Sequence, residues 1–235
     1  MAIAKVASVY GGSTDGNAFT TSAIDTTGAT SIVVVIVDGA GSAASGVADS
    51  ASNTWGSPVI GPLTVGSVRL QAWICAGPTT SATHTFSATG GAIYGPTLSA
   101  IAFSGTLTAS VLDQYDSDTV TGASTIQPGS ITPTEDNEML VTAVGSNDGI
   151  TVVDAPFSPA DGYVSPSGQH QGAALAISLQ TTATARNPTW NWGFAANGAA
   201  MILSLKEAAT GQFARTVFNA FQTFGPQTVR HITIQ

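Results

Sequence analysis

The apolar residues of this chain occur in short runs, and this spacing restricts the folds available to it. The runs are rich in Val, Ile, Thr and Ala and are separated by clusters of Gly, Pro, Asn and Asp, a pattern typical of strands and turns. No helical apolar stripe of twelve or more residues occurs before position 207. The pattern predicts an all-β protein, with strands at 3–10, 17–24, 30–38, 67–76, 83–88, 97–105, 138–146, 171–180 and 198–206.

The two halves of the chain resemble each other weakly. Matching segments are 30–41 with 137–149, 70–86 with 174–190, and 97–105 with 199–207. The match places Ile32, Ile74 and Phe103 opposite Met139, Ile177 and Leu203. Neither half has enough long strands to close a core alone. We therefore expect residues 1–207 to form one two-sheet antiparallel sandwich, jelly-roll or immunoglobulin-like, in which the two similar halves interleave.

The last 28 residues, 208–235, differ in composition from the rest of the chain and predict a C-terminal extension. They contain four of the nine Phe and neither Asp nor Glu. A helix of about three turns is expected to place Phe213, Val217, Phe218, Phe221 and Phe224 on one face. Gly225-Pro226 would end that helix, and "TVRHITIQ" would follow as a β segment. These Phe and Val side chains, together with Arg230, are predicted to form a subunit or partner contact.

Charge and targeting signals exclude several classes of protein. The formal net charge is −8 with only six scattered Lys and Arg, which argues against nucleic-acid binding. The longest aliphatic run, "IVVVIV", is far shorter than the ~20 residues that span a bilayer, so no membrane insertion is expected. The N-terminus lacks the apolar region of a signal peptide, which predicts synthesis in the cytoplasm without Sec export. The single Cys75 is read as a core thiol.

Three polar clusters are candidate binding sites. "VADSASNTW" (47–55) could offer oxygen ligands from Asp49, Ser50 and Asn53 to Ca²⁺, but it supplies one carboxylate where calcium usually takes several. The favoured interpretation is a turn whose side chains bond its own amides. The acidic stretches "TEDNEM" (134–139) and "DQYDSD" (113–118) could serve glycoside hydrolysis or metal binding, and are interpreted as solvated surface loops.

No catalytic or metal motif appears. The three His are isolated, and neither a nucleophile elbow nor a phosphate-binding loop occurs. We therefore expect a protein that is not an enzyme and has no cofactor and no metal. In "NPTWNWGF" (187–194), Trp190 and Trp192 would share one face of a strand. The pair could stack on sugar rings, or could belong to the core or to a subunit contact.

The order of these segments resembles a β-sandwich module of bacteriophage virion proteins and some bacterial surface proteins. The similar residues are "SIVVVIVDGAG", "VADSASNTW", "THTFS" and "LSAIAFSG", followed by "NEMLVTAVGS" and "GAAMILSLKE" in the second half. The likeness covers about residues 30–207 and leaves 208–235 unexplained. It implies a virion structural role and supplies no catalytic residues.

The expected function is therefore that of a virion protein, most simply a capsid decoration or head-fibre subunit. The low charge content, 9% of residues, suits a protein with neighbours on several sides. Expected partners are other copies of the chain, by analogy in three-fold contacts, and virion proteins such as the major capsid protein. The alternative is a receptor- or glycan-binding module of a phage tail or bacterial surface, with a cell-surface glycan as partner.

Overall fold

The computed structural model describes residues 2–12, 19–39, 42–90, 95–160 and 172–209. The strands of the first half are β1 (Ala4–Gly12), β2 (Ser31–Asp38), β3 (Gly46–Asp49), β4 (Ile60–Val65), β5 (Val68–Ala76), β6 (Phe86–Thr89) and β7 (Thr97–Ser104). Those of the second half are β8 (Leu112–Ile126), β9 (Glu138–Ser146), β10 (Ile150–Val153), β11 (Ser158–Pro159), β12 (Gly172–Gln180) and β13 (Trp190–Leu205). Every ladder between these strands is antiparallel. The predicted all-β antiparallel sandwich is confirmed.

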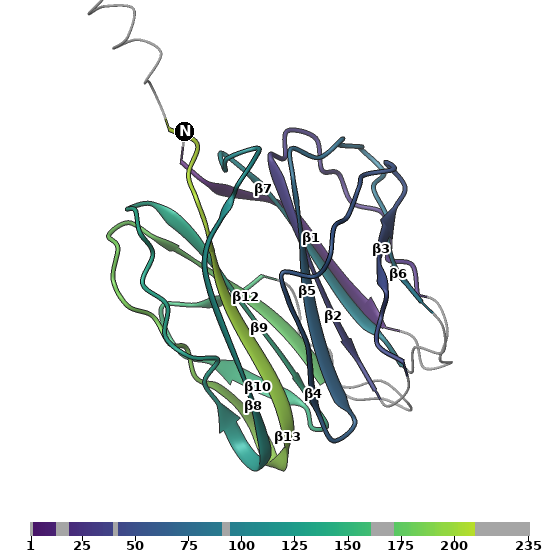
Figure 1. Cartoon of the computed structure of the whole chain (residues 1–235), viewed down its shortest axis with the longest axis vertical. Helices are drawn as coiled ribbons and strands as arrows, with labels where there is room; N and C mark the ends of the chain where they lie inside the picture. Colours follow the sequence, from purple (N-terminus) through teal and green to yellow (C-terminus); the bar gives the residue numbers. More distant parts are fainter. Residues whose placement is uncertain (1, 13–18, 40–41, 91–94, 161–171, 210–235) are drawn as a thin grey trace, which may run out of the picture.

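Each half of the chain builds one sheet of the sandwich (Figure 1). The first sheet has the order β1-β7-β2-β5-β4. In the second sheet β8 pairs with β13, which is followed by β9, β12 and β11, while β10 pairs with the first residues of β13. β1, β7, β2, β5 and β4 of the first sheet thus correspond in position to β8, β13, β9, β12 and β11 of the second. The halves are stacked rather than interleaved, which corrects the expected arrangement.

The register of the central strands accounts for the internal likeness. Val33 of β2 lies between Ile74 and Ile101, and Val141 of β9 lies between Ile177 and Leu203. Val33 and Val141 are therefore equivalent, together with their neighbours on both sides. The sequence match of Ile32 with Met139 is wrong by one residue, and such a shift exchanges the two faces of a strand. Ile32 indeed packs on the outer side of its sheet, whereas Met139 packs between the sheets.

The two sheets are related by an approximate two-fold axis. β4, at one edge of the first sheet, lies against β8 at an edge of the second. At the opposite edges, Lys5 Nζ of β1 donates a hydrogen bond of 2.7 Å to the carbonyl of Ala160, next to β11. Each pair joins equivalent edges with the roles of the halves exchanged. This geometry follows if both halves fold alike and bury the same face.

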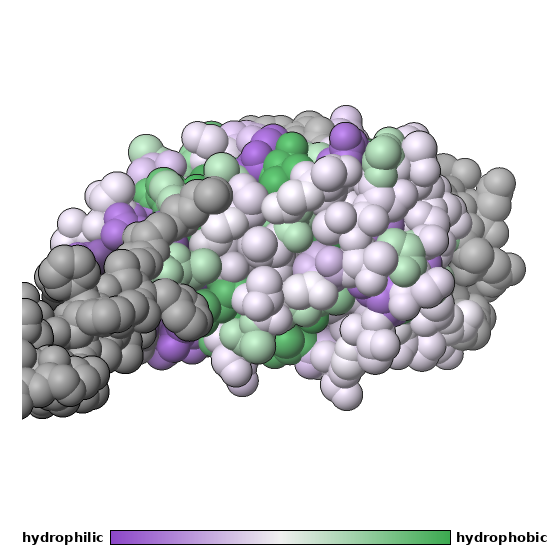
Figure 2. Space-filling model, turned by 90° about the horizontal axis from the view of Figure 1, so that it is seen from above, coloured by the Kyte–Doolittle hydropathy of each residue, from purple (hydrophilic) through white to green (hydrophobic). Residues whose placement is uncertain are grey.

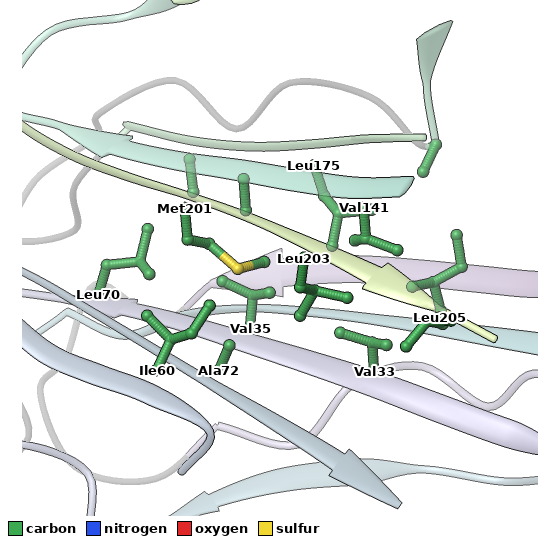
Figure 3. Packing of buried hydrophobic residues seen from close by; sticks show 14 of the residues in the cluster. Val33, Val35, Ile60, Leu70, Ala72, Val141, Leu175, Met201, Leu203 and Leu205 are labelled. Atoms are coloured by element: carbon green, nitrogen blue, oxygen red, sulfur yellow. The ribbon is translucent and has the colours of Figure 1, made fainter. Parts of the chain in front are cut away.

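Three apolar clusters account for the fully apolar central strands. The largest lies between the sheets, where Val33, Val35 and Leu70 of one sheet meet Val141 and Met201 of the other (Figure 3). A second cluster lies on the outer face of the first sheet under β3 and β6. A third lies on the outer face of the second sheet and contains the side chains of Trp190 and Trp192. β2 and β9 are therefore buried on both faces, as continuous apolar runs predict.

The predicted strand at 17–24 is wrong over the part that the structure describes. Residues 19–24 form only isolated bridges, from Thr20 to Ser87 and from Ile24 to His84. Polar and small residues surround Phe19 and Ile24 in this segment, so it crosses the outer face of the first sheet instead of joining it. The predicted helix and β segment of 208–235 lie outside the described residues beyond position 209.

Candidate functional site

The polar loop at 47–55 is held by the side chain of Asp49, at the end of β3. Asp49 Oδ1 accepts hydrogen bonds from the backbone amides of Ala51 (2.9 Å) and Asn53 (3.1 Å), and Oδ2 accepts one from Trp55 Nε1 at 2.6 Å. Burial acts to raise the pKa of Asp49, but these hydrogen bonds and His84 outweigh it, and the pKa is lowered. Asp49 is therefore an internal anion that organises its own turn.

The same loop is bonded to the segment 79–85. Asn53 donates from Nδ2 to the carbonyl of Thr79 at 3.0 Å and accepts from the amide of Thr79 at 2.7 Å. Ser50 Oγ accepts from the amide of Thr85 at 3.0 Å. The three side chains that could have been calcium ligands thus bond the backbone. Among the residues that the structure describes, no group of three or more His, Cys, Asp and Glu is arranged to hold a metal ion.

His84, which appears isolated in the sequence, lies between Asp49 and Thr26. Its Nε2 is 3.3 Å from Asp49 Oδ1, and its Nδ1 is 2.9 Å from Thr26 Oγ1. The order of acid, imidazole and hydroxyl is that of a catalytic triad. However, Thr26 is fully buried, and its hydroxyl also bonds the backbone of Ser81. The ring of His84 stacks on Phe86 at 4.4 Å. The chain of polar groups therefore joins the two-stranded β3–β6 sheet to the segment that precedes β2.

The structure brings the two acidic stretches together, which the sequence did not predict. Asp113 and Glu138 lie at the starts of β8 and β9, and the side chain of Asp113 is only 3% exposed while Glu138 is fully buried. Asp113 accepts from the amide and the hydroxyl of Thr134, both at 2.7 Å, and lies 3.1 Å from Lys206 Nζ. The interpretation of both stretches as solvated loops is therefore wrong at these two carboxyl groups. Residues 113–118 belong to strand β8.

The pKa values of Glu138 and Asp113 are shifted in opposite directions. Burial raises the pKa of Glu138 to about 7; the Ser204 hydroxyl lowers it and the Asp113 carboxylate adds to the rise. Neither oxygen of Glu138 has a hydrogen-bond partner of normal geometry among the described residues. Burial also acts to raise the pKa of Asp113, but hydrogen bonds from Thr134 and Lys206 leave it lowered. Such a pair can keep one proton near neutral pH, but Glu138 lies at 0% exposure.

Trp190 and Trp192 are core residues, which was one of the three alternatives that the sequence left open, and the pair is not available for stacking on a sugar. Trp190 is 0% and Trp192 is 4% exposed. Trp190 Nε1 donates to Thr142 Oγ1 at 3.0 Å, and Trp192 Nε1 donates to the carbonyl of Ala123 at 2.8 Å. The two rings share one face of β13, as predicted, but that face is the outer cluster of the second sheet.

Replacing Trp192 with Phe should lower the free energy of unfolding by about 2 kcal/mol, because it removes one hydrogen bond and part of a packed ring. Urea unfolding measures the change. Phe194→Leu is the matched control, since Phe194 is 78% exposed, and it should change stability by less than about 0.5 kcal/mol. Unchanged stability of Trp192→Phe would contradict its place in the core.

A small pocket on the second sheet lies beside Arg186. It has a volume of about 130 Å³ and is lined by Asp154, Ala155, Pro156, Phe157, Ala185, Arg186, Asn187 and Pro188. Arg186 Nε is buried without a hydrogen-bond partner within the described chain. A pocket of this size accommodates several waters or one small ligand.

The surface of the described chain includes the outer strand β8 and a few separate apolar side chains. Among the described strands β8 forms a ladder only with β13, and β4 of the other sheet lies against it. The exposed large apolar residues are Tyr10, Tyr115, Val152, Leu179 and Phe194. Figure 2 shows a face that is mostly pale, with small separate green and purple areas. No helix in the described ranges is long and apolar enough to cross a bilayer.

Comparisons with known proteins leave the family open. No family model matches the sequence, and no curated protein matches it. Among solved structures, the chain is similar to a conserved protein of unknown function from Pseudomonas aeruginosa, with 11% identity and a TM-score of 0.30 over 86% of this chain and 91% of that one.

Proposed function

We propose that this chain is a non-enzymatic structural protein of a bacteriophage or phage-like particle, most simply a capsid decoration or head-fibre subunit. In this role it associates with itself and docks on neighbouring virion proteins through residues 208–235. One observation supports the proposal above the others. The side chains that could carry chemistry, including Asp49, His84 and Trp190, bond within the fold.

The exposed surface fits this role. Few charges repel neighbouring copies, since only 9% of the residues are charged, and net repulsion is what keeps freely diffusing proteins apart. The setting in a virion comes from the sequence resemblance over residues 30–207. Quantitative mass spectrometry of purified particles tests it, with many copies per particle as the expected result. Absence of the protein from particles would refute the virion role.

Deleting residues 208–235 should leave the sandwich folded and abolish its assembly. β13 ends at Leu205, before the deleted segment, and four exposed Phe would form the kind of apolar patch that marks an interaction site. Each Phe contributes roughly 1.5–3 kcal/mol when buried. Light scattering measures assembly, and circular dichroism measures folding.

The matched variant keeps the length and changes Phe213, Phe218, Phe221 and Phe224 to Ser. It should lose assembly as the deletion does. If the deleted protein instead unfolds and the full chain is monomeric, the segment covers its own sandwich and the proposal fails.

A glycan-binding role is the second candidate, and one observation favours it. Phe194 is 78% exposed, and its amide is fixed by a 2.7 Å hydrogen bond to Asp148 Oδ2. An exposed aromatic ring on an anchored backbone can stack on a sugar. Glycan-array binding that Phe194→Ala abolishes, without loss of stability, would support this role over assembly.

A further inference from the structure

The side chain of Arg186 differs from the other Lys and Arg side chains that the structure describes. Lys5, Arg69 and Lys206 each lie 2.7–3.1 Å from a carbonyl or carboxylate oxygen of the protein. Arg186 takes part in none of the ion pairs between described residues, and its buried Nε has no hydrogen-bond partner among them. A guanidinium stays charged in proteins, and a buried donor without an acceptor is unfavourable. Arg186 therefore keeps its capacity to bind an acceptor oxygen.

The pocket beside Arg186 is formed by two loops that are bonded to each other. Residues 154–157 follow β10, and residues 185–188 precede β13, the strand that pairs with β10. The amide of Asp154 donates to the carbonyl of Thr189 at 3.1 Å, and the amide of Thr189 donates to Asp154 Oδ1 at 3.0 Å. The amide of Phe157 closes the first loop by donating to the carbonyl of Asp154 at 3.2 Å. These bonds fix the two walls relative to each other.

The backbone that carries Arg186 is also held from its other side. The amide of Arg186 donates to the carbonyl of Ile131 at 2.9 Å, and the amide of Ile131 donates back at 3.1 Å. The amide of Gly129 donates to Asn187 Oδ1 at 3.2 Å. Phe157, at 7% exposure, supplies an apolar wall. A pocket that is already ordered avoids part of the entropic cost of binding.

The lining indicates the kind of ligand that fits. The planar guanidinium matches the paired oxygens of a carboxylate or a phosphate. Asp154 also lines the pocket, and within the described ranges it forms no ion pair with Arg186. Its negative charge repels a doubly charged anion more strongly than a singly charged one. The volume of about 130 Å³ suits one small group. A carboxylate meets these conditions better than a phosphate or a sulfate.

We propose that the Arg186 pocket binds a carboxylate group, with the guanidinium of Arg186 donating to its oxygens. Two sources can supply this group, namely a small organic acid in solution and the C-terminal carboxylate of a protein chain. The inference goes beyond the assembly role and does not depend on it, because no residue that lines the pocket lies in 208–235.

Titration of the full-length protein with sodium acetate tests the proposal, with sodium chloride added to keep the ionic strength constant. Amide NMR at pH 7 should show saturable shifts in 154–157 and 185–189. Arg186→Gln should weaken acetate binding by about tenfold or more, because it removes charge-assisted hydrogen bonds. Arg186→Lys keeps the charge without the planar fork and should bind with intermediate affinity.

Lys206→Gln is the matched control, since it removes the same charge beyond the opposite end of β13. A charge so far from the pocket is screened by salt, so acetate affinity should change by less than about twofold. Unfolding curves check that each variant is folded. Shifts that do not saturate, or equal acetate binding by Arg186→Gln and the natural chain, would overturn the proposal.

Sodium sulfate tests the class of ligand. It should bind more weakly than acetate, because Asp154 lines the same pocket. Asp154→Asn keeps an oxygen for the amide of Thr189 and should raise sulfate affinity more than acetate affinity. Tighter binding of sulfate than of acetate by the natural chain would refute a carboxylate site.

N-acetylglycine distinguishes the two sources of the carboxylate, because it resembles the end of a protein chain. Tighter binding of N-acetylglycine than of acetate would support the site and identify a chain end as its ligand. Tighter binding of acetate would support the site and identify a free organic acid. Failure of both to bind would overturn the proposal and leave the assembly role unaffected.

Discussion

Replacing Asp49 with Ala should lower the free energy of unfolding by about 3–5 kcal/mol, because each buried donor left without its acceptor costs about 1–3 kcal/mol. The side chains of Asp49 and His84 are both 0% exposed. The substitution leaves two backbone amides and Trp55 Nε1 without their acceptor, and each such loss is unfavourable. Urea unfolding at pH 7 measures the change.

Asp25→Ala is the matched control for this experiment. Asp25 also accepts a backbone amide two residues on, from Thr27 at 2.8 Å, but it is exposed. The loss of Asp25 should cost much less than the loss of Asp49. A cost for Asp49→Ala no larger than that of Asp25→Ala would show that the buried contact with His84 and Trp55 contributes little.

Replacing Glu138 with Gln should remove a pH dependence of stability. The pKa of Glu138 is raised from 4.5 to about 7 in the folded state, so the folded protein holds this proton more tightly than the unfolded chain. The stabilisation is complete below pH 4.5 and is lost as the pH rises through 7. A shift of this size corresponds to about 3 kcal/mol. Gln resembles the protonated acid and keeps a donor for Asp113.

The measured quantity is the difference in unfolding free energy between Glu138→Gln and the natural chain. It should move in favour of the variant by about 3 kcal/mol between pH 4.5 and 8. Other titrating groups are common to both proteins and cancel. Exposed Glu135→Gln should show no such trend. A constant difference across this range would mean that Glu138 is ionised in the folded protein.

The sequence predicted the central strands because burial on both faces leaves continuous apolar runs. β2, β5, β7, β9 and β12 were all expected close to their observed bounds. β8 was not expected, because an exposed edge strand needs no apolar pattern, and its Asp and Gly residues read as a loop. β4 was missed for a similar reason, since Gly61 and Pro62 are turn residues. These two strands are set by their neighbours, which the local sequence does not encode.

For the candidate sites, the sequence predicted the local role of the residues but not which distant residues cover or contact them. The turn role of Asp49 follows from residue types in its own loop, and its amide bonds lie within four residues. Its neighbour His84 comes from a distant segment. The Trp190/Trp192 pair was placed on one face of a strand, yet nothing local indicates that the face is covered. Likewise the burial of Glu138 depends on Asp113 and Lys206, which adjoin it only through the sheet.

The position of β13 has a mechanical consequence for any load carried by the C-terminal segment. Residues 198–203 of β13 are paired on both sides, with β9 and with β8, and the chain leaves the sandwich from the end of this strand, beside the start of β1 (Figure 1). Ladder hydrogen bonds lie perpendicular to an antiparallel strand. Tension on the tail therefore shears two ladders together rather than peeling one bond at a time. A subunit tethered through this tail would therefore unfold only at high force, and both ladders would break in one step.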